Sequence, residues 1–317
     1  MEFRRRLMRL AIDSVVGRTI PNLKIDRNRG IRSLVDLGTH FASSEQQKNI
    51  FTKLQKIAHS PKNPYNALLL RAVYESDAEI IRRVGVNLGY TAFTCGTGII
   101  RQNSKKWGTP FPWILLLDCL DCSAEQLAGM LREGETYGIF NYIVLIRCKK
   151  DFNMLTTLTS QFSESTFWAV MSSDFADEQI CHTIKERKNV VAIVEVNAPE
   201  DASKLHILKT NALLFGFLCR DTQPFLERSF LTSMAESGCL FGVYSGKDLL
   251  NAVGLHKQRF FFPHNHQKYP LAIVDWQRDV QLIGGQILPG SGCKIIRYET
   301  AVRHQFQLGP ILWGKKG

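Results

Sequence analysis

Alternation between short apolar runs and helical patterns is the feature that most restricts how this chain folds. Six apolar runs of strand length occupy residues 113–118, 140–146, 166–171, 190–196, 213–218 and 240–244. Segments with helical spacing follow at residues 123–137, 154–162, 177–188, 199–210, 222–237 and 246–256. Parallel strands need such crossovers, so the pattern predicts an α/β fold with a parallel sheet. Units of repeated length favour a partial (β/α)6 TIM-like barrel over an open doubly wound sheet.

Two further regions flank this pattern. Before it, apolar residues recur at helical spacing, beginning with Phe3, Leu7 and Val15, so residues 1–107 are predicted to be an all-helical region. Residues 108–258 form the predicted barrel. Strand-like segments at 271–276, 281–288 and 294–298 are separated by glycine-rich turns, which predicts an irregular, β-rich C-terminal extension over residues 259–317 whose strands close or extend the barrel.

Positive charge is concentrated in the helical region. The formal net charge is +11, and residues 1–110 hold 19 Lys and Arg against 8 Asp and Glu, which accounts for the whole excess. Four arginines flank the apolar stripe of the first helix: Arg4, Arg5, Arg6 and Arg9. Two interpretations are open, namely contact with an anionic membrane or nucleic acid, and a helix packed on its own domain with solvated arginines.

The sequence predicts neither a secretion signal nor a membrane span. The N-terminal segment lacks the uninterrupted apolar core and the cleavage site of a secretion signal, and no run approaches the ~18 apolar residues of a membrane span. The eight cysteines are therefore expected to be reduced thiols rather than a disulfide framework. We expect a cytoplasmic protein without a transmembrane segment, with peripheral membrane contact as the alternative.

Several short motifs occur in a fixed order along the chain. The entry to the first strand reads Pro-Phe-Pro-Trp-Ile-Leu-Leu-Leu-Asp at residues 110–118. Further motifs lie at residues 213–217, 234–244, 246–248, 275–279 and 283–285. Their order over roughly residues 60–300 resembles a branch of the radical S-adenosylmethionine (SAM) superfamily that has an N-terminal helical region and a cysteine-bearing tail. This resemblance implies a TIM-like partial barrel.

The positions that would carry chemistry in that family depart from its pattern. The CxxxCxxC loop that binds a [4Fe–4S] cluster is replaced by a shorter segment with only Cys119 and Cys122. The turn that would hold the SAM amino group reads Arg-Cys-Lys-Lys-Asp at residues 147–151, an expected Asn-Gly turn reads Ser-Ser-Asp at residues 172–174, and Gln286 replaces the tail cysteine. The resemblance therefore implies a pseudoenzyme with no radical chemistry and no cofactor. An iron–sulfur cluster or zinc is expected only if a partner or dimer completes the Cys119/Cys122 site.

Two sets of residues remain as candidate sites. The Cys119/Cys122 pair can supply half of a tetrahedral metal site or a redox pair, and His264 and His266 could complete a four-ligand set. The predicted barrel mouth offers residues that could bind an anionic ligand or a partner carboxylate: Arg147, Lys149, Lys150, Glu195 and Asn197. The plainer interpretations are inert thiols and solvated polar turns.

Three functional hypotheses agree with these residues. The first is a non-catalytic binding or scaffold subunit, which acts as the partner of an active radical SAM enzyme or as a peptide- or ligand-binding module. The second is an enzyme of different chemistry with a Cys-based metal or thiol site at the barrel mouth. The third is an electrostatic adaptor that binds anionic membrane or nucleic acid through the N-terminal third. The first hypothesis implies a protein partner or a homo-oligomer.

Overall fold

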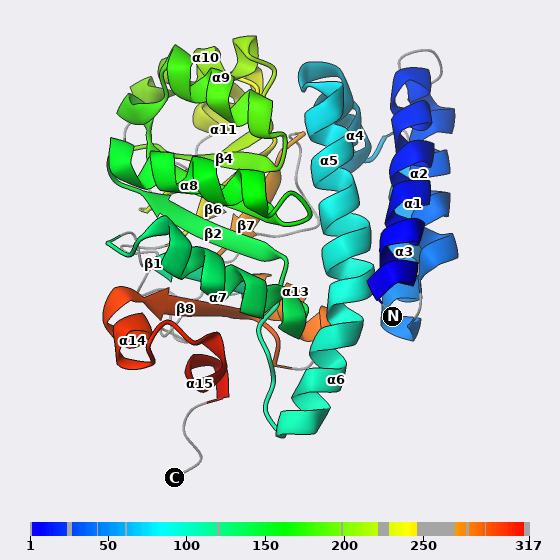
Figure 1. The fold of residues 1–317 in the computed structure, drawn as a ribbon. Helices are drawn as coiled ribbons and strands as arrows, with labels where there is room; N and C mark the ends of the chain where they lie inside the picture. The colour runs from blue at the N-terminus through cyan, green and yellow to red at the C-terminus, as the bar shows by residue number, and fades with distance from the viewer. Residues whose placement is uncertain are drawn as a thin grey trace.

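The molecule combines a helical region with a curled parallel sheet that carries helices on its outer face (Figure 1). The computed structural model describes residues 2–23, 27–42, 44–60, 62–118, 121–197, 199–220, 228–245, 270–276, 279–288 and 290–313. The helices of the first part are α1 (Glu2–Leu23), α2 (Arg27–Phe41), α3 (Glu45–Ala58), α4 (Pro64–Glu75), α5 (Ala78–Val86), the π-helical segment η1 (Asn87–Gly96) and α6 (Thr97–Trp107). This helical region agrees with the apolar periodicity of the sequence.

Eight parallel strands of the described residues form one sheet. They are β1 (Ile114–Asp118), β2 (Asn141–Ile146), β3 (Thr166–Ser172), β4 (Val190–Glu195), β5 (Phe215–Cys219), β6 (Phe241–Tyr244), β7 (Ala272–Asp275) and β8 (Cys293–Arg297). The strand order is β7-β6-β5-β4-β3-β2-β1-β8, and every pairing is parallel. Leu116 of β1 lies opposite Ile143 of β2 on one side and Ile295 of β8 on the other. The sheet is a curled half-barrel.

The C-terminal part agrees with the sequence in two of its strands and differs in a third. The described sheet has eight strands rather than the six of the predicted barrel, because β7 and β8 extend it, as expected for the strand-like segments 271–276 and 294–298. Residues predicted as a strand at 281–288 fall mostly in a helix, α13 (Asp279–Ile287). A Cβ on Gly284 would lie 2.7 Å from the Cα of Gly292, so glycine lets this helix lie against the turn before β8. The glycines therefore permit a close helix contact and do not interrupt a strand.

The two faces of the sheet build separate apolar layers, because successive strand residues point to opposite sides. The crossover elements between the strands are α7 (Ala124–Tyr137), α8 (Lys149–Gln161), η2 (Ser173–Phe175), α9 (Glu178–Arg187), η3 (Pro199–Leu205), α10 (His206–Thr210) and α11 (Arg228–Glu236). The larger core cluster lies between these helices and the sheet, where Tyr142 stacks on Phe167 with ring centroids 5.6 Å apart. The opposite face forms a second apolar cluster, which includes Leu116, Ile143, Val170, Ile193, Leu218 and Val243.

After β8, α14 (Tyr298–Arg303) and α15 (Leu308–Trp313) return the chain toward α7 and the end of α6. The ring of Trp313 stacks on Trp107 with centroids 4.3 Å apart. Glu133 of α7 accepts hydrogen bonds from the Leu308 N–H at 2.5 Å and the Gly309 N–H at 2.8 Å. These contacts fix the C-terminal helices against both parts of the molecule.

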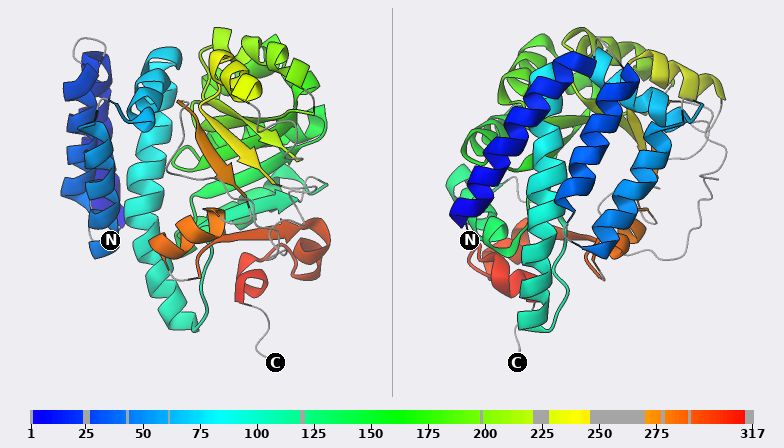
Figure 2. Two further views of the ribbon diagram at one scale, coloured as in Figure 1. Left: turned by 180° about the vertical axis from the view of Figure 1, so that it is seen from behind. Right: turned by 90° about the vertical axis from the view of Figure 1, so that its right-hand side faces the viewer.

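The helices α1, α2 and α3 lie side by side as an outer layer over the continuous α5–η1–α6 rod (Figure 2). The predicted helix at the N-terminus is present, but its apolar stripe faces outward. Phe3 and Leu10 are 76% and 62% exposed, whereas Ile12 and Ile20 are buried against the helical core. Among the described residues, no helix is long and apolar enough to cross a membrane.

Candidate functional site

The carboxyl-terminal edge of the sheet carries two ion pairs between neighbouring strands. Asp118 at the end of β1 pairs with Arg147, which follows β2. Glu195 at the end of β4 accepts from the Nε of Arg220, which follows β5, at 2.5 Å. In both pairs the carboxylate is largely covered, while the guanidinium is about half exposed at 54% and 49%. The mouth therefore presents cations to solvent.

The other predicted mouth residues make local contacts. Lys149 and Lys150 begin α8 and are exposed. Lys149 lines a separate cavity of 340 Å³ between α8 and α9. Asn197 is exposed, and its backbone N–H donates to Asp201 Oδ2 at 2.9 Å. Arg220 was missed by the sequence analysis, although its position directly after a strand matches that of Arg147.

The predicted metal ligands divide between described and undescribed parts of the chain. Cys122 is buried and belongs to the apolar cluster between the sheet and its helices. Cys119, His264 and His266 lie outside the described residues. Within the described ranges, no group of three or more His, Cys, Asp or Glu side chains could hold a metal ion. The Cys122 thiol therefore packs among apolar side chains.

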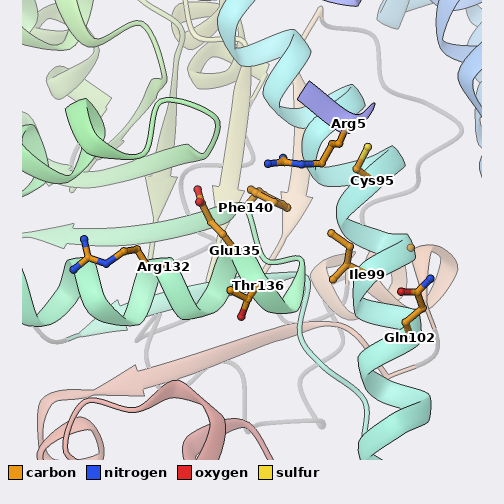
Figure 3. A pocket seen from close by; sticks show the side chains of 9 residues that line it. Arg5, Cys95, Ile99, Gln102, Arg132, Glu135, Thr136 and Phe140 are labelled. Atoms are coloured by element: carbon orange, nitrogen blue, oxygen red, sulfur yellow. The ribbon is translucent and has the colours of Figure 1, made fainter. Parts of the chain in front are cut away.

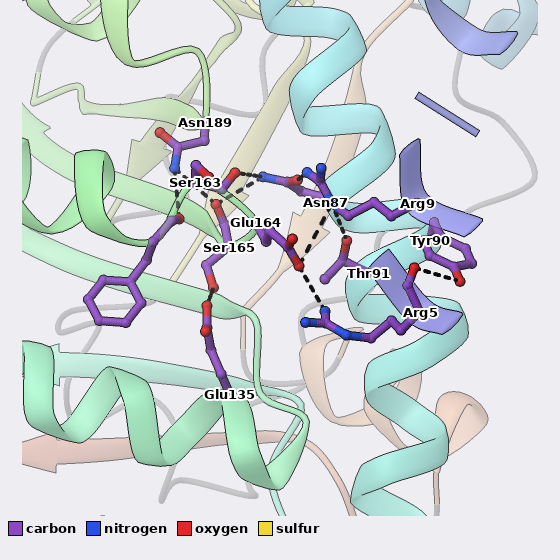
Figure 4. A network of polar contacts seen from close by, with 11 residues as sticks. Arg5, Arg9, Asn87, Tyr90, Thr91, Glu135, Ser163, Glu164, Ser165 and Asn189 are labelled. Carbon is purple, nitrogen blue, oxygen red and sulfur yellow. Dashed lines mark hydrogen bonds and ion pairs between the residues drawn. The ribbon is translucent and has the colours of Figure 1, made fainter. Parts of the chain in front are cut away.

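A polar network joins α1 to the sheet (Figure 4). The Arg5 Nη1 donates to Glu164 Oε2 at 2.8 Å. Arg9 is only 6% exposed, and it donates from Nη2 to Asn87 Oδ1 at 2.6 Å and from Nε to Thr91 Oγ1 at 3.2 Å. Burial lowers the pKa of Arg9, and the nearby Glu164 carboxylate opposes that shift. Glu164 lies 159 residues from Arg5, so this is a tertiary contact between the two parts.

The four arginines predicted to contact an external surface therefore divide. The prediction is wrong for Arg9, which is buried, and Arg5 is turned inward to its ion pair, because acceptors on η1 and before β3 bind both guanidinium groups. Arg6 is exposed on α1, and the side chain of Arg4 lies outside the described part of the chain.

Amide groups extend the same network from η1 to the sheet. Asn87 Nδ2 donates to the carbonyl oxygens of Ser163 and Ser165 at 3.0 and 3.1 Å. Asn189 Nδ2, which precedes β4, donates to the Ser165 carbonyl oxygen at 3.2 Å. The Ser165 hydroxyl in turn donates to Glu135 Oε1 of α7 at 2.9 Å. The network thus fixes the carboxyl group of Glu135 at the junction between the two parts.

A cavity of 560 Å³ opens beside this network (Figure 3), a size typical of small-molecule sites. Its lining residues come from α1, the η1–α6 rod, α7 and the approach to β2: Arg5, Cys95, Gly98, Ile99, Gln102, Arg132, Glu135, Thr136 and Phe140. Phe140 is buried and contributes its ring, which lies 5.5 Å from the Cζ of Arg5. Ile99 faces the cavity from the α6 side (Figure 3). The cavity therefore has an apolar floor and charged groups at its margin.

Two glycines set the spacing of the elements behind the cavity. A Cβ on Gly96 would lie 2.5 Å from the carbonyl oxygen of Gly138, and a Cβ on Gly138 would lie 2.5 Å from that of Gly96. Gly138 also ends α7 with a φ of +91°, a conformation that favours glycine. The start of α6 and the end of α7 therefore touch backbone to backbone.

The titratable groups that line the cavity differ in their polar partners and in how burial shifts their pKa. Burial raises the pKa of Glu135, and the hydrogen bond from Ser165 partly offsets this. The positive charges of Arg5 and Arg6 also lower the pKa of Glu135, whereas the Glu164 carboxylate raises it. Arg132 is exposed and lies one helical turn before Glu135, and no described carboxylate pairs with it. Burial also raises the pKa of the Cys95 thiol, which makes it a poor nucleophile at neutral pH.

Sequence reasoning missed most of this cavity, because its walls come from segments far apart in the chain. Of the lining residues, only Arg5 was singled out. Gly96 and Gly98 were the one signal in the sequence that could have indicated this cavity. Glycine inside a helix lowers its stability, so two glycines in a long helical pattern indicate a packing or functional role. No protein-family model matches this chain, and no curated protein matches it. The site is therefore interpreted from its own geometry.

Proposed function

We propose that this protein is a non-catalytic ligand-binding protein, a pseudoenzyme with a radical SAM-like, TIM-like partial barrel. Its ligand binds in the cavity between the helical region and α7. The observation that carries the proposal is the cavity itself, 560 Å³ in volume with an apolar floor and few charged groups. Small-molecule sites combine a mostly apolar concave surface with a few polar groups that orient the ligand.

The lining residues indicate the class of ligand. The Arg132 guanidinium suits a carboxylate, because it can donate two parallel hydrogen bonds. The Oε2 of Glu135 is an acceptor for an N–H or ammonium group. Phe140 and Ile99 provide an apolar surface beside both charges. A ligand with a carboxylate, an amine and an apolar body fits these groups, as in a short hydrophobic peptide or amino acid.

Filling the cavity gives the sharpest test. A Cβ on Gly98 would meet no atom within 4 Å, so Gly98→Leu places a side chain in the cavity without a clash at Cβ. Gly129→Leu is the matched control, because Gly129 of α7 is equally open and lies outside the cavity. Isothermal titration calorimetry with leucyl-phenylalanine should show binding to the natural chain and to Gly129→Leu, and binding at least about tenfold weaker to Gly98→Leu.

Dipeptides with one terminus blocked identify which end of the ligand each of the two charged groups binds. Arg132→Gln should weaken binding of the free dipeptide but not of its C-terminal amide. Glu135→Gln should weaken binding of the free dipeptide but not of its N-acetyl form. Equal affinity of Gly98→Leu and the natural chain would refute the cavity as the site, and no binding of any dipeptide to the natural chain would refute this ligand class.

A separate experiment addresses the absence of radical chemistry. The inward packing of Cys122 and the engagement of Asp118 by Arg147 support a barrel mouth without a cluster. Protein reconstituted without oxygen with iron and sulfide should therefore remain colourless and should not bind SAM. Iron near one full cluster per chain, with bound SAM, would contradict the pseudoenzyme proposal. Stoichiometric zinc lost in Cys122→Ser would instead favour an enzyme with a Cys-based metal site.

A further inference from the structure

The outward face of α1 carries an apolar stripe. Seven large apolar side chains are strongly exposed among the described residues, and four of them lie on this one helix: Phe3, Leu7, Leu10 and Val15. Phe3, Leu7 and Leu10 are spaced by four and three residues, which places them one above the other on the helix, and Val15 lies at the margin of this row. Ala11 and Ser14, which are also exposed, lie between them on the same face. Solvent therefore contacts a continuous stripe rather than scattered single side chains.

Polar contacts on the opposite side fix the orientation of α1. Arg9 donates to Asn87 and Thr91 at its buried position. Asp13, one turn further along, pairs with Arg82 of α5. Rotation of α1 to bury the apolar stripe would break these contacts and expose Ile12. The outward direction of the stripe therefore follows from how the helix is held.

The charges around the stripe are mainly positive. The exposed charged side chains described on α1 are Arg6 and Arg18. In the same outer layer, Lys48, Lys53 and Lys56 of α3 are exposed, against the two exposed acids Asp36 and Glu45. The helices of this layer lie toward the viewer in the right panel of Figure 2. Their described, exposed side chains combine an apolar stripe with an excess of cations.

We propose that α1 docks this protein onto an anionic lipid surface. The helix lies parallel to the surface, with its apolar stripe at the boundary between headgroups and acyl chains. An interfacial helix needs an apolar outer face and flanking cations. Leu7 and Leu10 lie on the exposed side of α1, and Arg6 and Arg18 are exposed on the same helix. Arg6, Arg18 and the lysines of α3 add attraction to anionic headgroups. The inward arginines Arg5 and Arg9 take no part.

A second copy of the chain fits the stripe less well. A stable interface between two copies involves about 20 residues on each partner, far more than one stripe of four large side chains. An isologous contact through α1 would also bring the exposed arginines of the two copies together, which like charges oppose. Nucleic acid fits less well again. Its phosphate backbone is bound mainly by cations, and aliphatic side chains gain nothing from contact with phosphates.

Vesicle co-sedimentation of the full chain tests the proposal. One set of vesicles is phosphatidylcholine alone, and the other contains phosphatidylglycerol as about a third of the lipid. The natural chain should bind the anionic vesicles more strongly than the neutral ones. Leu7→Gln/Leu10→Gln should lower the partition coefficient by about tenfold or more. Arg18→Gln should lower it by about fivefold on anionic vesicles alone.

The control is Leu282→Gln, which alters an equally exposed leucine on α13 and should leave binding unchanged. Far-UV circular dichroism and the melting temperature of each variant should match the natural chain, because the altered side chains do not pack in the core. Unchanged vesicle binding by Leu7→Gln/Leu10→Gln would overturn the proposal. A concentration-dependent dimer that this double variant abolishes would also overturn it, because the stripe would then be the interface with a second copy. RNA binding that the double variant abolishes would overturn it too.

Discussion

Replacing Arg9 by alanine tests the junction between the helical region and the barrel. The Arg9 guanidinium holds one short hydrogen bond of 2.6 Å to Asn87 Oδ1 and a longer one of 3.2 Å to Thr91 Oγ1. Its Nε also lies 3.9 Å from Glu164 Oε2. A hydrogen bond from a charged donor contributes about 1.5–3 kcal/mol, and a neutral one about 1 kcal/mol. Alanine also removes the desolvation cost of burying the guanidinium charge, which offsets part of this loss. That cost is the reason why burial lowers the pKa of Arg9.

We expect Arg9→Ala to reduce the free energy of unfolding by about 2–4 kcal/mol. That corresponds to a fall of roughly 3–6 °C in the melting temperature of a chain of this size. Arg9→Met keeps the aliphatic part of the side chain and should lose less than Arg9→Ala. Differential scanning calorimetry and urea denaturation followed by circular dichroism measure both variants.

The matched control is Arg18→Ala, which removes an exposed arginine from the same helix and should change stability by no more than about 0.5 kcal/mol. If Arg9→Ala is as stable as Arg18→Ala, the buried network contributes nothing net and the reasoning fails. A loss equal in Arg9→Met and Arg9→Ala would assign the effect to the guanidinium contacts. A loss in Arg9→Ala alone would assign it to packing of the side-chain stem.

Two further predictions concern α7. Gly129→Ala should stabilise the protein by about 0.5–1 kcal/mol, because the new Cβ meets open space. Gly134→Ala should destabilise it, because the new Cβ would lie 2.6 Å from the Tyr142 hydroxyl. Urea denaturation measures both changes, and a change of the same sign in both variants would contradict the prediction. Glu135→Gln should stabilise at neutral pH, because burial raises the pKa of Glu135 above its usual 4.5 and the charged form therefore opposes folding. The gain should shrink as the pH falls through the raised folded-state pKa toward about 4.5, which the melting temperature measured against pH would show.

Local patterns in the sequence predicted most of the elements. The apolar runs at 113–118, 140–146, 166–171, 190–196, 213–218 and 240–244 coincide with β1 to β6. In the structure, the side chains of Ser44 and Asp77 cap α3 and α5 by accepting hydrogen bonds from the first turn of each helix. Such signals are local, because strand alternation, helical spacing and capping depend on residues a few positions apart. They need no knowledge of what an element packs against.

Contacts between distant segments were beyond those patterns. The apolar period of α1 predicted a helix, but it did not say that Phe3 and Leu10 face solvent while Arg9 is buried. That choice depends on acceptors at Asn87 and Thr91, which only the folded chain brings beside α1. The pairing of β8 with β1 and the helical form of residues 279–287 are long-range results of the same kind.

The sequence by itself therefore determined the secondary structure of the first two-thirds of the chain, its parallel α/β class and the excess of positive charge in the helical region. Only the tertiary structure decided which face of α1 is buried, that β8 pairs with β1, and that a cavity opens between α6 and α7. The physical reason is that periodicity specifies that an element has two different faces, whereas the partner that covers a face is specified by distant residues. Several elements line the cavity together, so no single segment of sequence encodes it.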